Sequence, residues 1–277
     1  MSEYRLPQFL VGGAQKAGST WLAEMLSHHP ALYVPAKEVH FFDLDQNYAR
    51  GPGWYSEHFS AATDGQLCGE KTPDYLLVEK QDGTRLPAAQ RIREMLPDVK
   101  LLLVLRNPVT RAVSALRHHL WFRRFPISAA PEEILFGKHR DLAEEWSILS
   151  HGLYSVQLRH YFDLFPAEQI RVWIFEEDMK TNPLQLVRQA ASFIGVSEED
   201  ATIDPNRVSN RGVQSAIALR GHYYLPFLSI GWQVIDRILK QKFNVSQECL
   251  NRLIDHYSND VDALADLLGR DLSIWQA

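Results

Sequence analysis

The sequence predicts an α/β fold in which a central parallel sheet lies between two layers of helices. Short, continuous apolar runs are typical of strands buried on both faces, and Lys100–Leu105 is the clearest of them. These runs alternate with segments whose apolar residues recur at helical spacing. Of the 277 residues, 45% are hydrophobic and 23% are charged, which is typical of a globular protein. We therefore expect a single large domain over residues 1–277.

The individual elements follow from the same two patterns. Strands are expected at residues 9–11, 31–34, 66–71, 100–105 and 170–175. A first helix is expected around Trp21 and is stopped by His28–Pro30. Later helices are expected at residues 85–96, 108–120, 152–165, 183–194 and 246–268. The helix at 85–96 is closed by Pro97, the helix at 152–165 by Pro166 and the helix at 183–194 by Gly195. Residues 48–62 are expected to form a surface loop that leads into a short helix.

A glycine-bearing loop, GAQKAGST at residues 13–20, connects the first strand to the first helix. Such a loop turns backbone N–H groups inward and aims the positive end of a helix dipole at its contents, which suits a phosphate or another oxyanion. It keeps the two glycines of the pattern G-x-x-x-x-G-K-[ST], but Ser19 follows Gly18 and the only lysine is Lys16. This predicts a P-loop-like fold that holds its leaving group differently. The alternative is a tight turn without a ligand.

The strand Lys100–Leu105 ends in Arg106, and Asn107 and Pro108 then favour the start of a helix. Enzymes that transfer phosphate often have an acidic residue for Mg²⁺ at the end of such a strand. An arginine there indicates an anion and not a metal. Ser114 lies two helical turns beyond Asn107 and could add a hydroxyl contact. The alternative is an ordinary salt bridge and a solvated serine.

Two further residues suggest acid–base chemistry, and a third is expected at the edge of the ligand crevice. If residues 35–43 are extended, Glu38 and His40 point the same way and form a carboxylate–imidazole pair. The alternative, favoured by the pattern alone, is a solvated glutamate and a half-buried histidine. Lys71 is expected where a strand ends, and the carboxyl ends of strands line the ligand crevice of open α/β sheets.

Composition excludes several classes of protein. A net charge of −5 argues against a nucleic-acid partner. Cys68 and Cys249 match no metal-binding spacing, so we expect reduced thiols. The N-terminus has no apolar signal region, and no run approaches the ~18 apolar residues of a membrane span, so we expect a cytoplasmic protein.

The later part of the chain is less informative. Residues 204–221 are polar and are expected to form a loop that returns over the site. Tyr223–Trp232 is apolar and aromatic, and packing in the core is its favoured interpretation. The alternative is that it lines an acceptor pocket.

Four motifs in this order resemble the signatures of the sulfotransferases that use 3′-phosphoadenosine 5′-phosphosulfate (PAPS), especially the heparan-sulfate and related carbohydrate type. The motifs are QKAGSTWL from Gln15, KEVHFFD from Lys37, EKTP from Glu70 and LLLVLRNPVTRAVS from Leu101. The resemblance is dense from Phe9 to His119 and fades beyond about Gly195. It implies sulfuryl transfer from PAPS to the hydroxyl of a carbohydrate or small molecule, which leaves adenosine 3′,5′-bisphosphate.

The resemblance also implies roles for individual residues. Glu38 is the general base, His40 orients it or the acceptor, and Lys71 helps Lys16 to stabilise charge on the departing phosphate. The expected donor-binding residues are Lys16, Ala17, Gly18, Ser19, Thr20 and Trp21 for the 5′-phosphosulfate, Arg106 and Ser114 for the 3′-phosphate, and Arg211 and Gly212 in a late loop.

No metal is expected, because a sulfuryl group carries less charge than a phosphoryl group and lysine and backbone donors can suffice. The absence of a membrane anchor and of a late disulfide suggests a soluble, bacterial-type enzyme. Two other functions remain open, a metal-dependent P-loop kinase and a non-catalytic nucleotide-binding protein. The acceptor, O- or N-sulfation and the oligomeric state also remain open.

Overall fold

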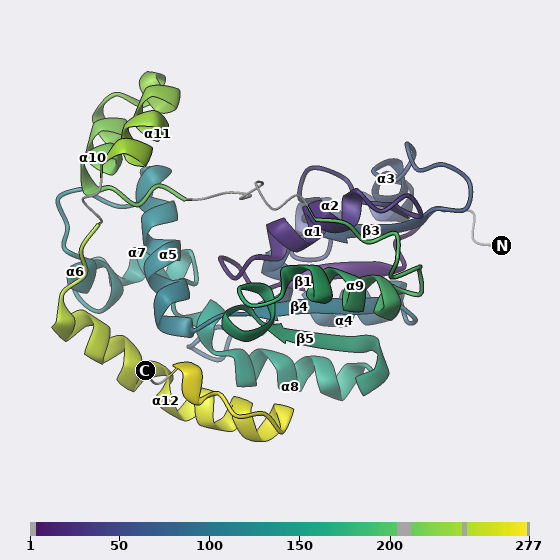
Figure 1. Cartoon of the computed structure of the whole chain (residues 1–277). Helices are drawn as coiled ribbons and strands as arrows, with labels where there is room; N and C mark the ends of the chain where they lie inside the picture. The colour runs from purple at the N-terminus through teal and green to yellow at the C-terminus, as the bar shows by residue number, and fades with distance from the viewer. Residues whose placement is uncertain (1–3, 204–211, 240–242, 276–277) are drawn as a thin grey trace. The chain divides into compact units, whose positions relative to one another are not determined.

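The computed structural model describes residues 4–203, 212–239 and 243–275, shown in Figure 1. The chain divides into two compact units. The first contains residues 1–107 and 154–210, and the second contains residues 108–153 and 211–277. The single domain expected from the sequence stays a prediction, and each unit is described by itself.

The first unit is built on a five-stranded sheet whose strands are all parallel. Its strands are β1 (Phe9–Gly13), β2 (Leu32–Tyr33), β3 (Leu67–Lys71), β4 (Lys100–Leu105) and β5 (Ile170–Ile174), in the order β2-β3-β1-β4-β5. The residues of β1 are all buried, and those of β4 are buried after Lys100. The expected fold class is confirmed, and β4 has the predicted bounds.

Helices lie on both faces of this sheet (Figure 1). On one face, α1 (Ser19–Ser27) and α9 (Pro183–Ile194) form a hydrophobic core with alternate strand residues such as Val11 and Val104. The strand residues between them face the other way, where α4 (Ala88–Met95) and α8 (Tyr154–Leu164) contact each other. The period of two along each strand thus produces three layers.

Short helical turns complete the first unit. They are α2 (Asp45–Tyr48), α3 (Gly51–Glu57), the 3₁₀ turns η1 (Pro73–Leu76) and η3 (Ala167–Gln169), and the π-helical turn η4 (Phe175–Met179). Within residues 48–62 the expected short helix is present as α3, but the expectation that the segment lies on the surface is wrong in part. Tyr55 on α3 is fully buried, so the segment packs into the protein instead of lying over it.

The second unit is helical. Its helices are α5 (Pro108–Trp121), α6 (Pro131–Leu135), α7 (Arg140–Glu145), α10 (Ala216–Tyr224), α11 (Ser229–Ile238) and α12 (Gln247–Leu268), with 3₁₀ turns η2 (Ser150–Gly152), η5 (Pro226–Leu228) and η6 (Ser273–Trp275). Both α10 and α12 contact α5. Among the helices of the described residues, none has the length and hydropathy that crossing a bilayer requires.

Two expectations for this part of the chain are wrong. The polar loop expected over residues 204–221 extends at most to Ser215, because residues 216–221 belong to α10, whose N-cap Ser215 accepts a hydrogen bond from the Ala218 N–H. The segment Tyr223–Trp232 does not pack in the core, since Tyr224 and Phe227 are 69% and 78% exposed.

Behind the carboxyl end of β3 lies a buried carboxylate, that of Glu70. It accepts hydrogen bonds from the hydroxyls of Tyr55 at 2.6 Å, Tyr75 at 2.7 Å and Thr72 at 2.9 Å. The Tyr75 hydroxyl also accepts the Phe41 N–H at 2.9 Å, and Thr72 Oγ1 accepts the His40 N–H at 3.3 Å. Glu70 therefore ties the backbone of residues 40–41 to the end of β3. Burial raises the pKa of Glu70, although the three hydrogen bonds oppose that shift.

We expect Glu70→Ala to lower the free energy of unfolding by more than about 2 kcal/mol. Three buried hydroxyls lose their acceptor, and each unsatisfied buried group costs about 1–3 kcal/mol. Urea titration measures this loss. Glu57→Ala, at an exposed position of α3, is the control and should change stability by less than about 0.5 kcal/mol.

If Glu70→Ala does not fold, Tyr55→Phe gives a milder test, because it removes a single donor and should cost about 1 kcal/mol. A Glu70→Ala protein as stable as the Glu57→Ala control would contradict the proposed role of the network.

Candidate active site

The candidate site lies at the carboxyl edge of three neighbouring strands. Lys71 is the last residue of β3, Gly13 is the last residue of β1, and Arg106 follows β4 directly. Because β3, β1 and β4 are adjacent and parallel, their ends meet at one edge of the sheet. The expectation that Lys71 ends a strand is confirmed.

The loop between β1 and α1 has the geometry of an anion-binding turn. Lys16 and Gly18 both have left-handed backbones, with φ of 66° and 106°. Gly18 is required for a second reason, since a Cβ there would lie 2.6 Å from the sulfur of Met179. Gly18 is the N-cap of α1, so residues 19–21 form the first helical turn and offer its positive end to an anion.

Arg106 is held beside this loop. Its Nη1 donates to the carbonyl oxygen of Lys16 at 3.3 Å, and its guanidinium lies over the Phe175 ring, 5.0 Å from the ring centroid. The Tyr154 hydroxyl donates to the Arg106 carbonyl at 2.9 Å and fixes its backbone. The strand-end arginine is thus directed to the loop, as an anion site requires.

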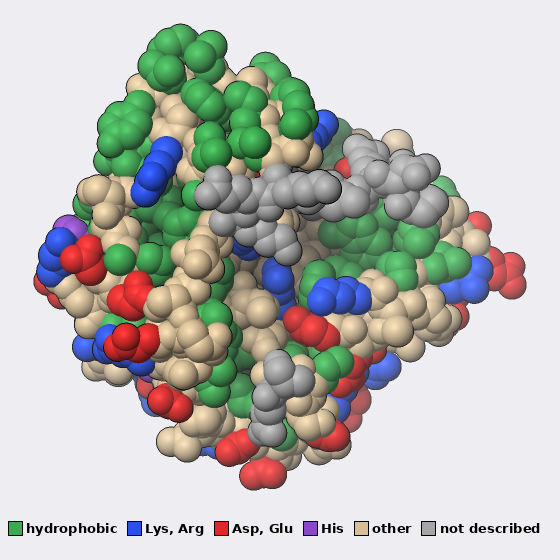
Figure 2. All heavy atoms as spheres, turned by 60° about the vertical axis from the view of Figure 1, so that its left-hand side comes forward, with side chains coloured by type: hydrophobic (Ala, Val, Ile, Leu, Met, Phe, Trp, Pro, Cys, Tyr) green, Lys and Arg blue, Asp and Glu red, His purple; other side chains and the backbone are tan. Residues whose placement is uncertain are grey.

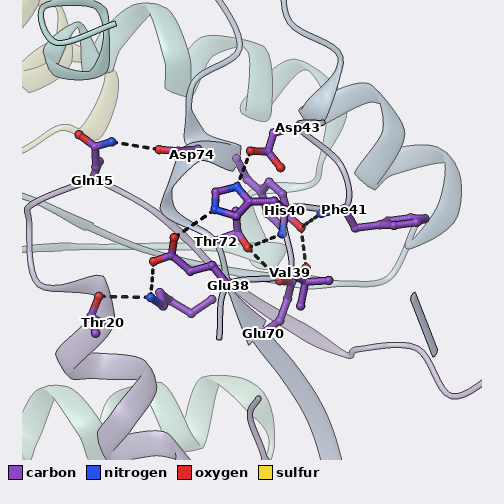
Figure 3. Close-up of polar contacts among 12 residues, drawn as sticks. Gln15, Thr20, Glu38, Val39, His40, Phe41, Asp43, Glu70, Thr72 and Asp74 are labelled. Carbon is purple, nitrogen blue, oxygen red and sulfur yellow. Dashed lines mark hydrogen bonds and ion pairs between the residues drawn. The ribbon is translucent and has the colours of Figure 1, made fainter. Parts of the chain in front are cut away.

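Glu38 links the loop to a network of ion pairs, which Figure 3 shows. Its Oε1 accepts a hydrogen bond from Nζ of Lys71, and that Nζ also lies 3.3 Å from Oγ1 of Thr20. Its Oε2 lies 3.2 Å from Nε2 of His40. On the other side of the imidazole, Nδ1 lies 2.7 Å from Oδ2 of Asp43. This network of ion pairs and hydrogen bonds therefore extends from Asp43 to the first turn of α1.

Glu38 and His40 meet through a turn and not through an extended strand. No strand is assigned at residues 34–44, and His40 has φ of 52°. Two contacts hold this left-handed backbone, the His40 N–H to Thr72 and the Asn47 side-chain amide to the His40 carbonyl at 2.9 Å. The extended geometry expected from the sequence is wrong, although the two side chains are neighbours.

Electrostatics keep both groups of this pair charged. Burial alone would raise the pKa of Glu38, but hydrogen bonds from His40 and Lys71 outweigh it and hold the pKa at about 2. The hydrogen bonds of His40 to Asp43 and then to Glu38 raise its pKa to about 10, against the opposing effect of burial. Near pH 7 the pair is therefore a carboxylate and an imidazolium. In this state His40 is hydrogen-bonded to Glu38, and neither ring nitrogen is available to accept a proton.

Asp74 lies beside this ion-pair network, and its Oδ1 accepts a hydrogen bond from Gln15 Nε2 at 3.2 Å. Burial raises its pKa to about 6. One ligand atom each from His40, Asp43 and Asp74 lies within 4.8 Å of the others, close enough to share a metal ion. An ion there would compete with the hydrogen bond between His40 and Asp43, so the metal-free site expected from the sequence stays a prediction.

The first unit brings together most of the candidate residues, which are Lys16, Ala17, Gly18, Ser19, Thr20, Trp21, Glu38, His40, Lys71 and Arg106. Ser114 and Gly212 belong to the second unit, where Ser114 is half-buried on α5 and Gly212 is exposed. Arg211 lies outside the described residues.

Sequence reasoning missed Asp43 and the hydroxyl of Thr72. Asp43 stands three residues after His40, and that spacing could have suggested a partner for the imidazole. The contacts of Thr72 join segments that are 32 residues apart, so no local pattern indicates them.

Comparison with known proteins identifies relatives over most of the chain. The sulfotransferase domain family matches residues 6–209. Human heparan sulfate glucosamine 3-O-sulfotransferase 6 is 34% identical over 194 residues, which are 69% of this chain and 53% of that protein. Mouse heparan sulfate glucosamine 3-O-sulfotransferase 5 is 27% identical over 232 residues, 80% of this chain and 60% of that protein. The chain thus matches only about half the length of the first of these relatives.

A solved structure matches nearly the whole chain. The sulfotransferase from Alicyclobacillus acidocaldarius superposes with a TM-score of 0.74 and 28% sequence identity, and the match covers 98% of this chain and 99% of that one.

The raised pKa of His40 predicts a pH-dependent contribution to stability. A group whose pKa is higher in the folded than in the unfolded protein stabilises the folded state. For His40 this stabilisation is fully present when the pH is below the unfolded-state pKa of about 6.5, and it is lost as the pH rises through the folded-state pKa of about 10. The stability difference between the parent protein and His40→Asn should therefore narrow from about pH 6 to about pH 10.

Urea titrations at about pH 6, pH 8 and pH 10 measure this narrowing. In an Asp43→Asn background the narrowing should be shallower, because the largest cause of the raised pKa is gone. A difference that stays constant over the whole range would show that His40 is not held as an imidazolium.

Proposed function

The chain belongs to the sulfotransferase domain family, and from this premise we propose that it transfers a sulfuryl group from PAPS to an acceptor hydroxyl. The observation that carries the proposal is the position of Lys71 Nζ, which contacts both Glu38 and Thr20. It joins the candidate base to the anion-binding turn, so an acceptor at Glu38 and a donor at the loop would lie on either side of one ammonium group.

In this proposal the loop holds the 5′-phosphosulfate through Lys16, the backbone N–H groups of residues 18 and 19 and the first turn of α1. Arg106 holds the 3′-phosphate, a role supported by its guanidinium fork and its contact with the loop. Family resemblance adds Ser114, Arg211 and Gly212 as further donor contacts.

Glu38 is the general base of the proposed reaction. It takes the proton of the acceptor hydroxyl while that oxygen attacks sulfur in line with the bond to the leaving phosphate oxygen. The bond between sulfur and the leaving phosphate oxygen breaks, and its electrons remain on that phosphate, leaving adenosine 3′,5′-bisphosphate. Lys16 and Lys71 stabilise this charge. His40 is a positioning residue, because it fixes one oxygen of Glu38 and leaves the other on Lys71.

We also propose that no metal is required. Lys16, Lys71 and Arg106 supply three positive charges at the carboxyl edge of the sheet, and their number is consistent with the lower charge of a sulfuryl group. A metal-dependent kinase remains the second candidate only because His40, Asp43 and Asp74 could share an ion.

The acceptor is proposed from the relatives. Their names describe sulfation of glucosamine in heparan sulfate, which supports a hydroxyl of a carbohydrate as the acceptor class for this chain. The cytoplasmic location expected from the sequence stays a prediction.

Glu38→Gln tests the base. The amide cannot accept the proton, so turnover should fall by about 10²–10⁴-fold, the usual contribution of general-base catalysis. Binding of adenosine 3′,5′-bisphosphate should stay within about threefold, measured by calorimetry, because Glu38 is assigned to the acceptor. Glu168→Gln, at an exposed position of η3, is the matched control and should retain full turnover. Unchanged turnover in Glu38→Gln would place the base elsewhere.

Calorimetry with adenosine 3′,5′-bisphosphate and with ADP tests the donor. We expect the bisphosphate to bind more tightly than ADP, with equal affinity in EDTA and in Mg²⁺. Arg106→Ala should weaken this binding by about 10- to 100-fold, the effect of losing a charged hydrogen-bond donor. Arg188→Ala, exposed on α9, is the matched control.

Two results would overturn the proposal. A preference for ADP with Mg²⁺ would favour the kinase, and binding of neither nucleotide would favour a non-catalytic protein.

A further inference from the structure

The helical hairpin formed by α10, η5 and α11 exposes an unusually apolar surface. Within the described residues, thirteen large hydrophobic side chains are exposed, and eight of them lie between residues 217 and 238. We call these eight residues the hairpin face: Ile217, Tyr224, Leu225, Phe227, Leu228, Ile230, Val234 and Ile238. Figure 2 shows hydrophobic side chains gathered over α10 and α11. A contiguous apolar surface of this kind marks an interaction site.

The hairpin is a packed structure, so its exposure does not come from a frayed end. Gly221 on α10 lies against the Trp232 ring, where an added Cβ would approach to 2.4 Å. The indole Nε1 of Trp232 donates to the Leu225 carbonyl at 3.1 Å. The other side of α10 is buried against α5, where His222 stacks on Trp121 at 3.6 Å. The inner surface of the hairpin is thus occupied, and the hairpin face points outward.

The spacing along α11 gives this face a direction. Ile230, Val234 and Ile238 follow each other at intervals of four residues and form one stripe along the helix. Phe227 precedes the stripe in η5. Ile230 and Phe227 are 77% and 78% exposed, values at which a large apolar side chain is almost fully surrounded by water.

The charged side chains exposed on the hairpin are basic. Arg220 and Arg237 are exposed on the same two helices. The sole acidic residue between residues 212 and 239 is Asp236, which is 9% exposed and accepts the N–H groups of Gln214 at 2.8 Å and Ser215 at 2.6 Å. Its charge is therefore turned inward, where it binds the two backbone N–H groups that precede α10. The chain has a net charge of −5, so this positive surface departs from the charge of the protein as a whole.

From the apolar stripe and the two exposed arginines on the same helices we propose that the hairpin face binds the surface of an anionic lipid bilayer. Helices that lie in the bilayer interface combine an apolar side with Lys or Arg flanks. Basic residues near the surface are attracted to anionic headgroups, and tyrosine and tryptophan favour the interface. A symmetric dimer through the same face would bring the arginines of both copies together, which disfavours self-association as the use of this surface.

The hairpin also lies beyond residues 6–209, the part of the chain that the family match covers. The proposed membrane contact therefore uses none of the residues assigned to the donor loop or the base, and its test requires no turnover.

Vesicle co-sedimentation tests the proposal. The full chain should bind mixed phosphatidylcholine–phosphatidylglycerol vesicles, bind phosphatidylcholine vesicles more weakly, and dissociate as salt is raised. The double variant Phe227→Asp/Ile230→Asp should lose at least about tenfold in partitioning, since two charged groups replace the most exposed apolar side chains. Ile254→Asp is the matched control, because Ile254 is 50% exposed on α12, away from the hairpin, and this variant should bind normally.

Each outcome decides the proposal. Equal urea stability and equal bisphosphate binding in both variants would show that folding and the donor site are intact. A folded parent protein that binds neither kind of vesicle overturns the proposal. Light scattering that finds a dimer without lipid, converted to a monomer by Phe227→Asp/Ile230→Asp, would assign the face to a second copy instead.

Discussion

The carboxylate of Glu70 accepts hydrogen bonds from three hydroxyls in a position that water does not reach. The side-chain alternation of β3 sends this carboxylate inward and turns the next residue, Lys71, to the opposite face. Two of the three hydroxyls also accept the N–H groups of residues 40 and 41. One strand end therefore fixes both the ammonium group of the site and the turn that carries Glu38 and His40. An unpaired buried carboxylate would be very unfavourable, so the network forms completely or the turn loses its support.

The ion pairs at Glu38 hold its carboxylate in place but lower its basicity, and the proposed transfer can resolve this conflict. A carboxylate with a pKa of about 2 is well ordered but is a weak base. Lys71 is one of the two groups that depress its pKa. In the proposed reaction, negative charge developing on the leaving phosphate would draw the ammonium group toward it and weaken its hydrogen bond to Glu38. The basicity of Glu38 would then rise as the acceptor hydroxyl releases its proton. The hydrogen bond between His40 and Asp43 would keep the carboxylate aligned.

The sequence was a good guide where a local pattern determines the structure. The apolar run of β4, the lysine at the end of β3 and the helix closed by Gly195 all have short-range signals. The pairing of Glu38 with His40 was foreseen from an extended backbone that does not exist. The left-handed turn at His40 depends on Thr72 and Asn47, which the local sequence cannot reveal. The network of Glu70 was missed for the same reason, because its partners come from α3 and η1.

The segment Tyr223–Trp232 was misjudged for a different reason. Hydrophobicity predicts removal from water, but it does not distinguish a protein core from a surface that another phase or molecule covers. Here the buried residues of α10, which are Ala218, Leu219 and His222, already fill the contact with α5, and the other large apolar residues remain outside. An apolar stripe with exposed arginines and an inward-turned aspartate is stable in water only at a cost in hydration. That cost is recovered if the stripe enters a bilayer interface, where the same arginines meet headgroups of opposite charge.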